Sequence, residues 1–106
     1  FQILPSLADK EQVHAYIQRT IGKLLDYDQK KGSHFIATLE KILQNNNLKS
    51  VAEELFVHHK TIVFRKKRIE EILGISLDSF ETRLTLTTAL KLRQAFQLSL
   101  ENINKN

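Results

Sequence analysis

Apolar residues recur three or four positions apart along most of the chain, which is the spacing of amphipathic helices. One such run extends over about 9–25, and a second over about 33–43, with Ser33 as the expected amino-terminal cap. The residues between them, 26–32, are polar and end in glycine, so they predict a connector. The amino-terminal part of the chain is therefore predicted to hold two helices, within residues 9–45.

The middle of the chain contains two shorter amphipathic segments, over about 48–55 and 59–73. Three asparagines at 45–47 interrupt the preceding helix and offer a cap for the first segment. A glycine directly after the second segment is suited to end it. Only residues 56–58 separate the two segments. Two short helices around a tight turn, the second of them basic, are typical of a helix-turn-helix, here within 48–73.

A last helix is predicted over about 80–100, after a connector at 75–79 in which Asp78 or Ser79 is the expected cap. Its apolar residues are spread around more than one face, so it needs two packing partners, either within one domain or across a dimer. No segment of useful length alternates apolar and polar residues as a strand does. The predicted fold class is all-α: a compact helical domain of four to six helices containing the helix-turn-helix.

Length and composition fit a single domain. The 106 residues suffice for a modest core, and 3 glycines and 1 proline are too few for a disordered chain. We therefore expect residues 1–106 to form one unit, with amino-terminal helices at 9–45, the helix-turn-helix at 48–73 and a carboxyl-terminal helix at 80–100. Because the chain starts at Phe1 and contains no methionine, we expect it to be a piece excised from a longer protein.

Several classes of protein are disfavoured by what the sequence lacks. There is no cysteine, no signal peptide and no apolar run approaching about 18 residues, so a reduced, cytoplasmic setting is expected. His58 and His59 are adjacent and would point about 100° apart on a helix, with no further residue to complete a metal site. His58 is instead expected to cap or orient the turn. Asp26 and Asp28 lack the other positions of a calcium loop. No catalytic arrangement is recognisable, so we expect neither an enzyme nor a cofactor.

The positive charge of the chain is concentrated in the second of the two short helices. The formal net charge is +4, and residues 59–68 alone carry +5. The remainder nearly cancels, so the excess is predicted to form one patch. A basic helix in a helix-turn-helix makes DNA the leading partner, because phosphates attract such a patch.

A helical wheel divides this basic helix into a core face and an outer face. Ile62, Ile69 and Leu73 fall within about 20° of one line and predict the buried side. The opposite side is predicted to carry Lys60, Phe64, Lys67 and Glu71, with Thr61, Val63 and Arg68 on the flanks. An outward phenylalanine is costly unless something covers it, such as a thymine methyl, a sugar edge or a partner subunit.

The docking geometry of this motif suggests roles for the side chains. The amino-terminal residues of the second helix reach base edges in the major groove, whereas other cations contact phosphates and set the register. The residues expected to contact bases or the groove are Lys60, Thr61, Phe64 and His59. Those expected to contact phosphates are Lys49, Ser50, Arg65, Lys67 and Arg68, the first two at the start of the preceding helix. Its amides are also candidates for holding a phosphate.

Phe56 stands where many helix-turn-helix sequences have glycine. A bulky side chain is unfavourable at positive φ. The turn is therefore expected to use another geometry, or Phe56 is expected to continue the helix and pack in the core.

The chain resembles the carboxyl-terminal domain of the PucR/CdaR family of bacterial transcriptional regulators. The resemblance covers about residues 20–93 and rests on LLDYD at 24–28, FIATLEKIL at 35–43, the segment 45–74 and LTLTTALKL at 84–92. The family signature is similar to LFxHRNTxxYRxxRIxxxLG. It is matched by Leu55, Phe56, His58, Thr61, Arg65, Arg68, Ile69, Leu73 and Gly74. The resemblance implies a sequence-specific DNA-binding module, usually dimeric, behind an amino-terminal ligand-sensing region; it also makes Phe56 usual at its position.

This sequence departs from the family signature at three places. His59-Lys60 replaces Arg-Asn, Phe64 replaces tyrosine, and Lys66 replaces an apolar residue. The first change alters the expected base contacts, so the DNA site of a relative cannot be transferred. The second removes a hydroxyl that could reach a phosphate, and the third adds a positive charge near the edge of the core.

The predicted partner is double-stranded DNA, read by a homodimer on an inverted repeat whose half-sites lie about 34 Å apart. We expect the final helix rather than the first to form the dimer, because its apolar surface exceeds what one domain needs. The alternative is a helical protein–protein module in which the basic helix and Phe64 dock on an acidic partner.

Overall fold

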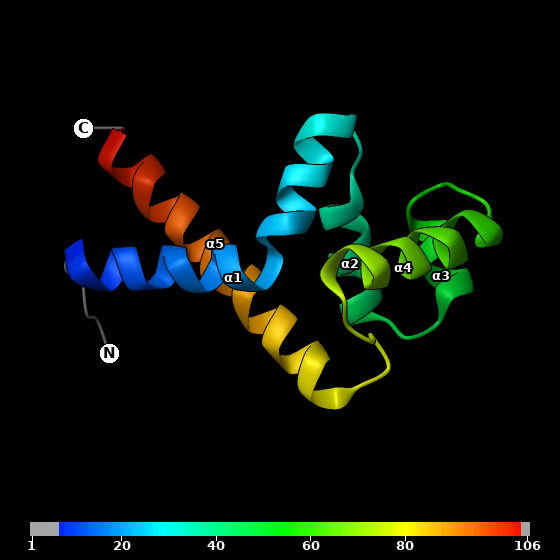
Figure 1. Cartoon of the computed structure of the whole chain (residues 1–106). Coiled ribbons are helices and arrows are strands. Elements are labelled where there is room, and N and C mark those ends of the chain that lie inside the picture. Colours follow the sequence, from blue (N-terminus) through cyan, green and yellow to red (C-terminus); the bar gives the residue numbers. More distant parts are fainter. Residues whose placement is uncertain (1–6, 105–106) are drawn as a thin grey trace.

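In the computed structural model, residues 7–104 are described, together with the side chains of residues 10–98. Over this part of the chain there are five α-helices and no strand (Figure 1). They are α1 (Leu7–Lys31), α2 (Phe35–Gln44), α3 (Leu48–Glu54), α4 (His59–Leu73) and α5 (Phe80–Asn104). The all-α prediction is confirmed, and α4 has the range predicted for the basic helix.

The two long helices, α1 and α5, cross each other, and α2, α3 and α4 form a group to one side (Figure 1). Figure 1 also shows α1 changing direction near its middle, so that its carboxyl-terminal half runs toward this group. Helix α1 packs against α2, α4 and α5, while α3 packs against α2 and α4. The predicted helix-turn-helix is therefore backed by α1 and α2.

One hydrophobic core joins all five helices. Apolar side chains stand at helical spacing on each element, so each helix presents one continuous buried stripe to the others. The buried apolar residues are Ile17, Ile21, Leu24, Phe35, Leu39, Ile42, Val51, Ala52, Ile62, Ile69, Leu77, Leu86, Ala89 and Leu90. Ile62 and Ile69 are fully buried and Leu73 packs against the core, which confirms the predicted core face of α4.

Helix α5 has two partners within the chain, as its spread of apolar residues requires. Leu86, Ala89 and Leu90 are buried, and the helix packs against both α1 and α2. Leu84 and Leu98 remain exposed on it, so not all of its apolar surface is covered by the described part of the chain.

The predicted connector at 26–32 and the predicted cap Ser33 are both wrong. Residues up to Lys31 continue α1, and the amides at the start of α2 are capped by Asp28. Its Oδ1 accepts from Phe35 N and its Oδ2 from Ile36 N, each at 2.9 Å. The Ser33 hydroxyl donates to the same carboxylate. A carboxylate at the end of the preceding helix therefore satisfies the two amides that the serine was expected to cap.

The other capping predictions are confirmed. Asn47 Oδ1 accepts from Lys49 N at 3.0 Å and from Ser50 N at 3.2 Å at the start of α3. Gly74 ends α4 in the left-handed conformation, with φ of 66°. At the start of α5, Ser79 Oγ accepts from Thr82 N at 3.4 Å, so the cap is Ser79 rather than Asp78.

Candidate nucleic-acid interface

The turn between α3 and α4 is built on a left-handed residue, Phe56, with φ of 58°. Phe56 N donates to Glu53 O at 3.2 Å and Val57 N donates to Ala52 O at 3.0 Å. These two bonds form a Schellman motif, in which a left-handed residue lets the chain satisfy the last helical carbonyls.

Both expectations for Phe56 are therefore wrong. The turn does use positive φ, and the phenyl ring does not enter the core, since the residue is 94% exposed. Val57, the next residue, packs against the core instead. The reversal of direction after α3 needs the left-handed geometry, and its cost of about 1–2 kcal/mol is offset by the two hydrogen bonds and this packing.

The start of α4 is held by His58. Its Nδ1 accepts from Lys60 N at 3.0 Å, which confirms that this histidine caps or orients the turn. Among the described residues no three histidines or acids are grouped as a metal site would require.

The outer face of α4 is exposed as the helical wheel predicts. Lys60, Phe64, Lys67 and Glu71 are all exposed, and Phe64 is 63% exposed. His59 and Thr61 at the amino-terminal end are partly exposed. Five of these side chains stand within the first two to three turns of the helix, which is the part of a recognition helix that enters the major groove.

Arg65 lies on one flank of α4 and is anchored to α2. Its Nη1 donates to Thr38 Oγ1 at 3.2 Å, and Thr38 is buried. A guanidinium carries five N–H donors in a fixed plane, so this bond orients the group without using all of its donors. Thr38 was not predicted to support the interface. The signal was present, because it is a polar residue on the apolar stripe of α2 and so needs a buried partner.

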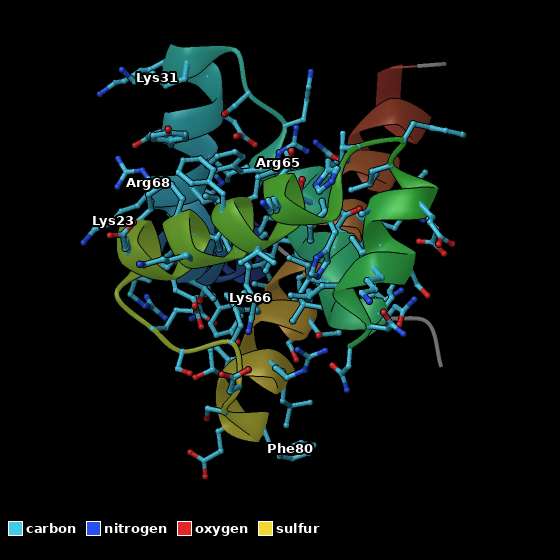
Figure 2. The ribbon with its side chains drawn as sticks, turned by 90° about the vertical axis from the view of Figure 1, so that its right-hand side faces the viewer. Lys23, Lys31, Arg65, Lys66, Arg68 and Phe80 are labelled. Atoms are coloured by element: carbon cyan, nitrogen blue, oxygen red, sulfur yellow. The ribbon has the colours of Figure 1, made fainter. Side chains whose placement is uncertain are left out.

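Arg68 lies on the same flank, one turn further along, and is held by α1. Its guanidinium carbon is 5.5 Å from the centre of the Tyr27 ring, a cation–π distance. Tyr27 in turn stacks on Phe35, with ring centres 5.1 Å apart. Arg68 Nη1 also lies 3.7 Å from Glu71 Oε1. Figure 2 shows Arg65 and Arg68 along α4 in this part of the molecule.

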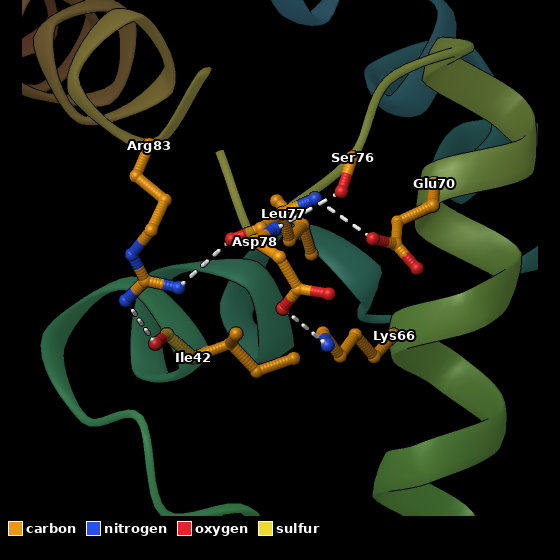
Figure 3. Close-up of polar contacts among 7 residues, drawn as sticks. All are labelled: Ile42, Lys66, Glu70, Ser76, Leu77, Asp78 and Arg83. Carbon is orange, nitrogen blue, oxygen red and sulfur yellow. Dashed lines mark hydrogen bonds and ion pairs between the residues drawn. The ribbon is translucent and has the colours of Figure 1, made fainter. Parts of the chain in front are cut away.

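The other flank of α4 faces the connector to α5 (Figure 3). Lys66 Nζ lies 3.1 Å from Asp78 Oδ1, and the Lys66 side chain is only 22% exposed. Glu70 Oε2 accepts from Leu77 N at 2.7 Å. Arg83 donates from Nη1 to Leu77 O at 3.2 Å and from Nη2 to carbonyls at the end of α2. These contacts fasten the connector between α2, α4 and α5.

The basic residues of α4 are consequently not one patch, contrary to the expectation from sequence. Lys66 points to the connector and is paired with an acid, whereas Lys60 and Lys67 are exposed on the outer face. Arg65 and Arg68 lie on the opposite flank, against α2 and α1. Successive residues on a helix point about 100° apart, so a run of neighbouring cations is divided among several faces.

At the start of α3 the side chain of Lys49 is exposed and that of Ser50 is partly exposed. Their amides are already bonded to Asn47 Oδ1, and Val51 N donates to Asn47 O at 3.1 Å. Three amides of this helix are therefore engaged within the chain, and the phosphate contact expected at its start stays a prediction. None of the described helices is both long and apolar enough to cross a membrane.

The sequence of this chain is similar to those of known proteins. The family model described as the PucR C-terminal helix-turn-helix domain matches residues 35–92, from the start of α2 into α5. The chain is 33% identical over 93 residues to the proline-responsive transcriptional activator PutR of Bacillus subtilis, covering 87% of this chain and 23% of that protein. The 93 aligned residues exceed the 72 residues from Phe35 to Asn106 inclusive, so the similarity to PutR extends into α1.

Two further relatives come from the same organism. The chain is 29% identical over 94 residues to the DNA-binding transcriptional activator AdeR, covering 88% of this chain and 22% of AdeR. It is 29% identical over 85 residues to the purine catabolism regulatory protein, covering 79% of the chain and 16% of that protein. The chain thus spans less than a quarter of the length of these curated relatives. No solved structure matches it significantly. The match across α2 to α5 shows that the chain belongs to the PucR family of helix-turn-helix domains, which are DNA-binding parts of transcriptional regulators.

Proposed function

We propose that this chain binds double-stranded DNA sequence-specifically, with α4 in the major groove, as the output domain of a ligand-responsive bacterial regulator. One observation carries the proposal: a family helix-turn-helix presents the amino-terminal half of α4 outward while Ile62 and Ile69 hold its opposite side in the core. An α-helix exposed in this way fits the major groove of B-DNA.

The contacts to bases are assigned to the amino-terminal half of α4. The side chains of Lys60 and Phe64 are exposed and those of His59 and Thr61 are partly exposed, which supports this assignment. Lys60 can donate to guanine acceptors, and the Thr61 hydroxyl or methyl can meet a base edge or a thymine methyl. The exposed ring of Phe64 is then covered by a thymine methyl or the sugar edge.

The phosphate contacts are assigned to cations around this reading face. Lys49 and Ser50 stand at the start of α3, the helix that precedes α4, and Lys67 points outward from α4. Arg65 and Arg68 are held in place by Thr38 and Tyr27, so less side-chain freedom is lost when they meet a phosphate.

The proposal extends to the whole regulator in three respects. Two copies bind an inverted repeat with half-sites about 34 Å apart, paired through α5, where Phe80 and Leu84 are exposed. A sensor region outside this chain supplies the response to a ligand, since one relative is named proline-responsive and is about four times longer. The regulator works in the cytoplasm, where the bacterial chromosome lies.

The competing function is docking on an acidic protein, favoured by the exposed rings of Phe56 and Phe64 next to basic side chains. Selection of bound sequences from a random duplex library by the 106-residue chain separates the two. Enrichment of an inverted repeat supports a dimeric sequence-specific regulator, and enrichment of one half-site supports DNA reading by a monomer. Retention without enrichment contradicts sequence specificity, and no retention contradicts DNA binding and favours the protein partner.

A further inference from the structure

A second set of basic side chains lies beside the helix-turn-helix, on the carboxyl-terminal half of α1. Lys23 and Lys31 are exposed there. Figure 2 shows both of them with Arg68 of α4 along one edge of the molecule. Neither lysine forms an ion pair with any residue that the structure describes. We call Lys23, Lys31 and Arg68 the α1 edge.

Tyr27 joins this edge to the recognition helix. Lys23 precedes Tyr27 by four residues and Lys31 follows it by four, so the three side chains share one side of α1. The Arg68 guanidinium lies over the Tyr27 ring at 5.5 Å, and the ring rests on Phe35. The lysines of α1 are therefore set beside the carboxyl-terminal half of α4 by a packed aromatic contact.

Three acids lie near the edge, and among the described residues only Glu71 forms an ion pair with it. Both oxygens of Asp28 accept hydrogen bonds from the start of α2, so that carboxylate is already engaged at the helix terminus. Glu71 lies 3.7 Å from Arg68, and Asp26 is exposed on α1 without an ion pair among the described residues. Arg65 lies on the adjoining flank, so four cations, Lys23, Lys31, Arg65 and Arg68, stand against these three acids.

We propose that the α1 edge is a second DNA-binding surface, which contacts phosphates flanking the half-site that α4 reads; this rests on the proposed function. The amino-terminal half of α4 is the part that enters the groove, whereas the α1 edge is joined to the carboxyl-terminal half through Arg68 and Tyr27, where it can meet the flanking backbone. Lys23 and Lys31 are eight residues apart, about 12 Å along α1, a length comparable to the rise of about three to four phosphates of one strand.

The test is a salt titration of binding to a mixed-sequence duplex of about 30 base pairs, roughly three helical turns. The test variant is Lys23→Gln/Lys31→Gln. The matched control, Lys10→Gln/Lys41→Gln, removes the same charge from the amino-terminal end of α1 and from α2, where no DNA or dimer contact is assigned. Each lost phosphate contact lowers the slope of log affinity against log salt by about 0.9 in magnitude. The test variant is expected to lose about 2 from the slope and roughly tenfold in affinity at about 0.15 M salt, with the control unchanged.

The outcomes separate this inference from the proposed function. Failure of the unaltered chain to bind any duplex overturns both. Binding by the unaltered chain with equal slopes for test and control variants overturns the α1 edge alone. Lys23→Arg/Lys31→Arg keeps the charges and is expected to retain the original slope; loss of slope in this variant also contradicts the proposal. Circular dichroism of all variants, expected to show unchanged helix content, verifies that the substitutions leave the fold intact.

Discussion

Arg65 of α4 donates from Nη1 to Oγ1 of Thr38, a buried residue of α2 27 positions earlier in the chain. The same hydroxyl lies 3.2 Å from His34 O, to which it donates. A single buried threonine thus joins the start of α2 to a cation on the edge of the proposed DNA-binding face. Because Arg65 is oriented by the protein before DNA is bound, the relationship has consequences for both stability and affinity.

Thr38→Val removes this hydroxyl while keeping the volume of the side chain. We expect a loss of about 1–2 kcal/mol in the free energy of unfolding, because the buried polar contact is lost and Arg65 loses its partner. Duplex affinity is expected to fall several-fold as well. Urea unfolding and fluorescence anisotropy measure the two effects. Thr38→Ser keeps the hydroxyl and is the control; if it loses as much affinity as the valine variant, the bond does not position Arg65.

Phe56→Gly is expected to raise the free energy of unfolding. Glycine adopts positive φ without the steric cost of about 1–2 kcal/mol, part of which is offset by its greater freedom in the unfolded chain. Valine is β-branched and is especially unfavourable at positive φ, so Phe56→Val is expected to be less stable than the original chain. Thermal unfolding followed by circular dichroism orders the three proteins. A glycine variant that is less stable than the valine variant would contradict the strained turn.

Two neighbouring lysines of α4 are expected to respond differently to loss of charge. Lys67→Gln removes an exposed cation and should reduce the salt dependence of DNA binding by about 0.9 in slope. Lys66→Leu should leave the slope nearly unchanged, because Lys66 is directed to Asp78, and should alter stability by less than about 1 kcal/mol. Salt titrations of the two variants in parallel test this. Equal losses of slope would show that Lys66 also reaches DNA.

Asp28→Ala is expected to destabilise the chain by about 1–2 kcal/mol, because two amides at the start of α2 lose their acceptor. Ser33→Ala, at the position that the sequence favours as cap, is expected to cost less, since it removes only a hydroxyl that donates to the same carboxylate. Chemical denaturation of both variants compares them. The reverse order of stability would restore Ser33 as the principal cap.

Arg68→Ala and Thr61→Ala are expected to change DNA binding in different ways. A phosphate contact carries no sequence information, so loss of Arg68 should weaken all duplexes alike and lower the salt slope. Loss of Thr61 should change which base is preferred at one position, by about 0.5–1.5 kcal/mol of discrimination, since a hydroxyl makes a single neutral hydrogen bond. Selection from a duplex library followed by salt titration measures both. If the two variants have the same profile, their assigned roles are wrong.

Much of the helical architecture was predictable because its signals are local. Asn47, His58 and Gly74 each act within a few residues of their own position, and all three cap as expected. The core face of α4 followed from the helical repeat, since Ile62 and Ile69 must point the same way whatever surrounds them. The Phe56 prediction failed because residue type argues against positive φ, whereas the chain reversal after α3 requires it.

The sequence by itself determined an all-α domain, the range of α4 and the membership of the chain in a family of helix-turn-helix domains, because spacing, caps and signature residues are properties of short segments. Only the tertiary structure decided which cations share a surface. It separates Lys66 from Lys67, sets Arg65 on Thr38 and Arg68 on Tyr27, and places Lys23 and Lys31 beside α4. These relationships depend on how helices distant in sequence pack against one another, and no local pattern of residues encodes that packing.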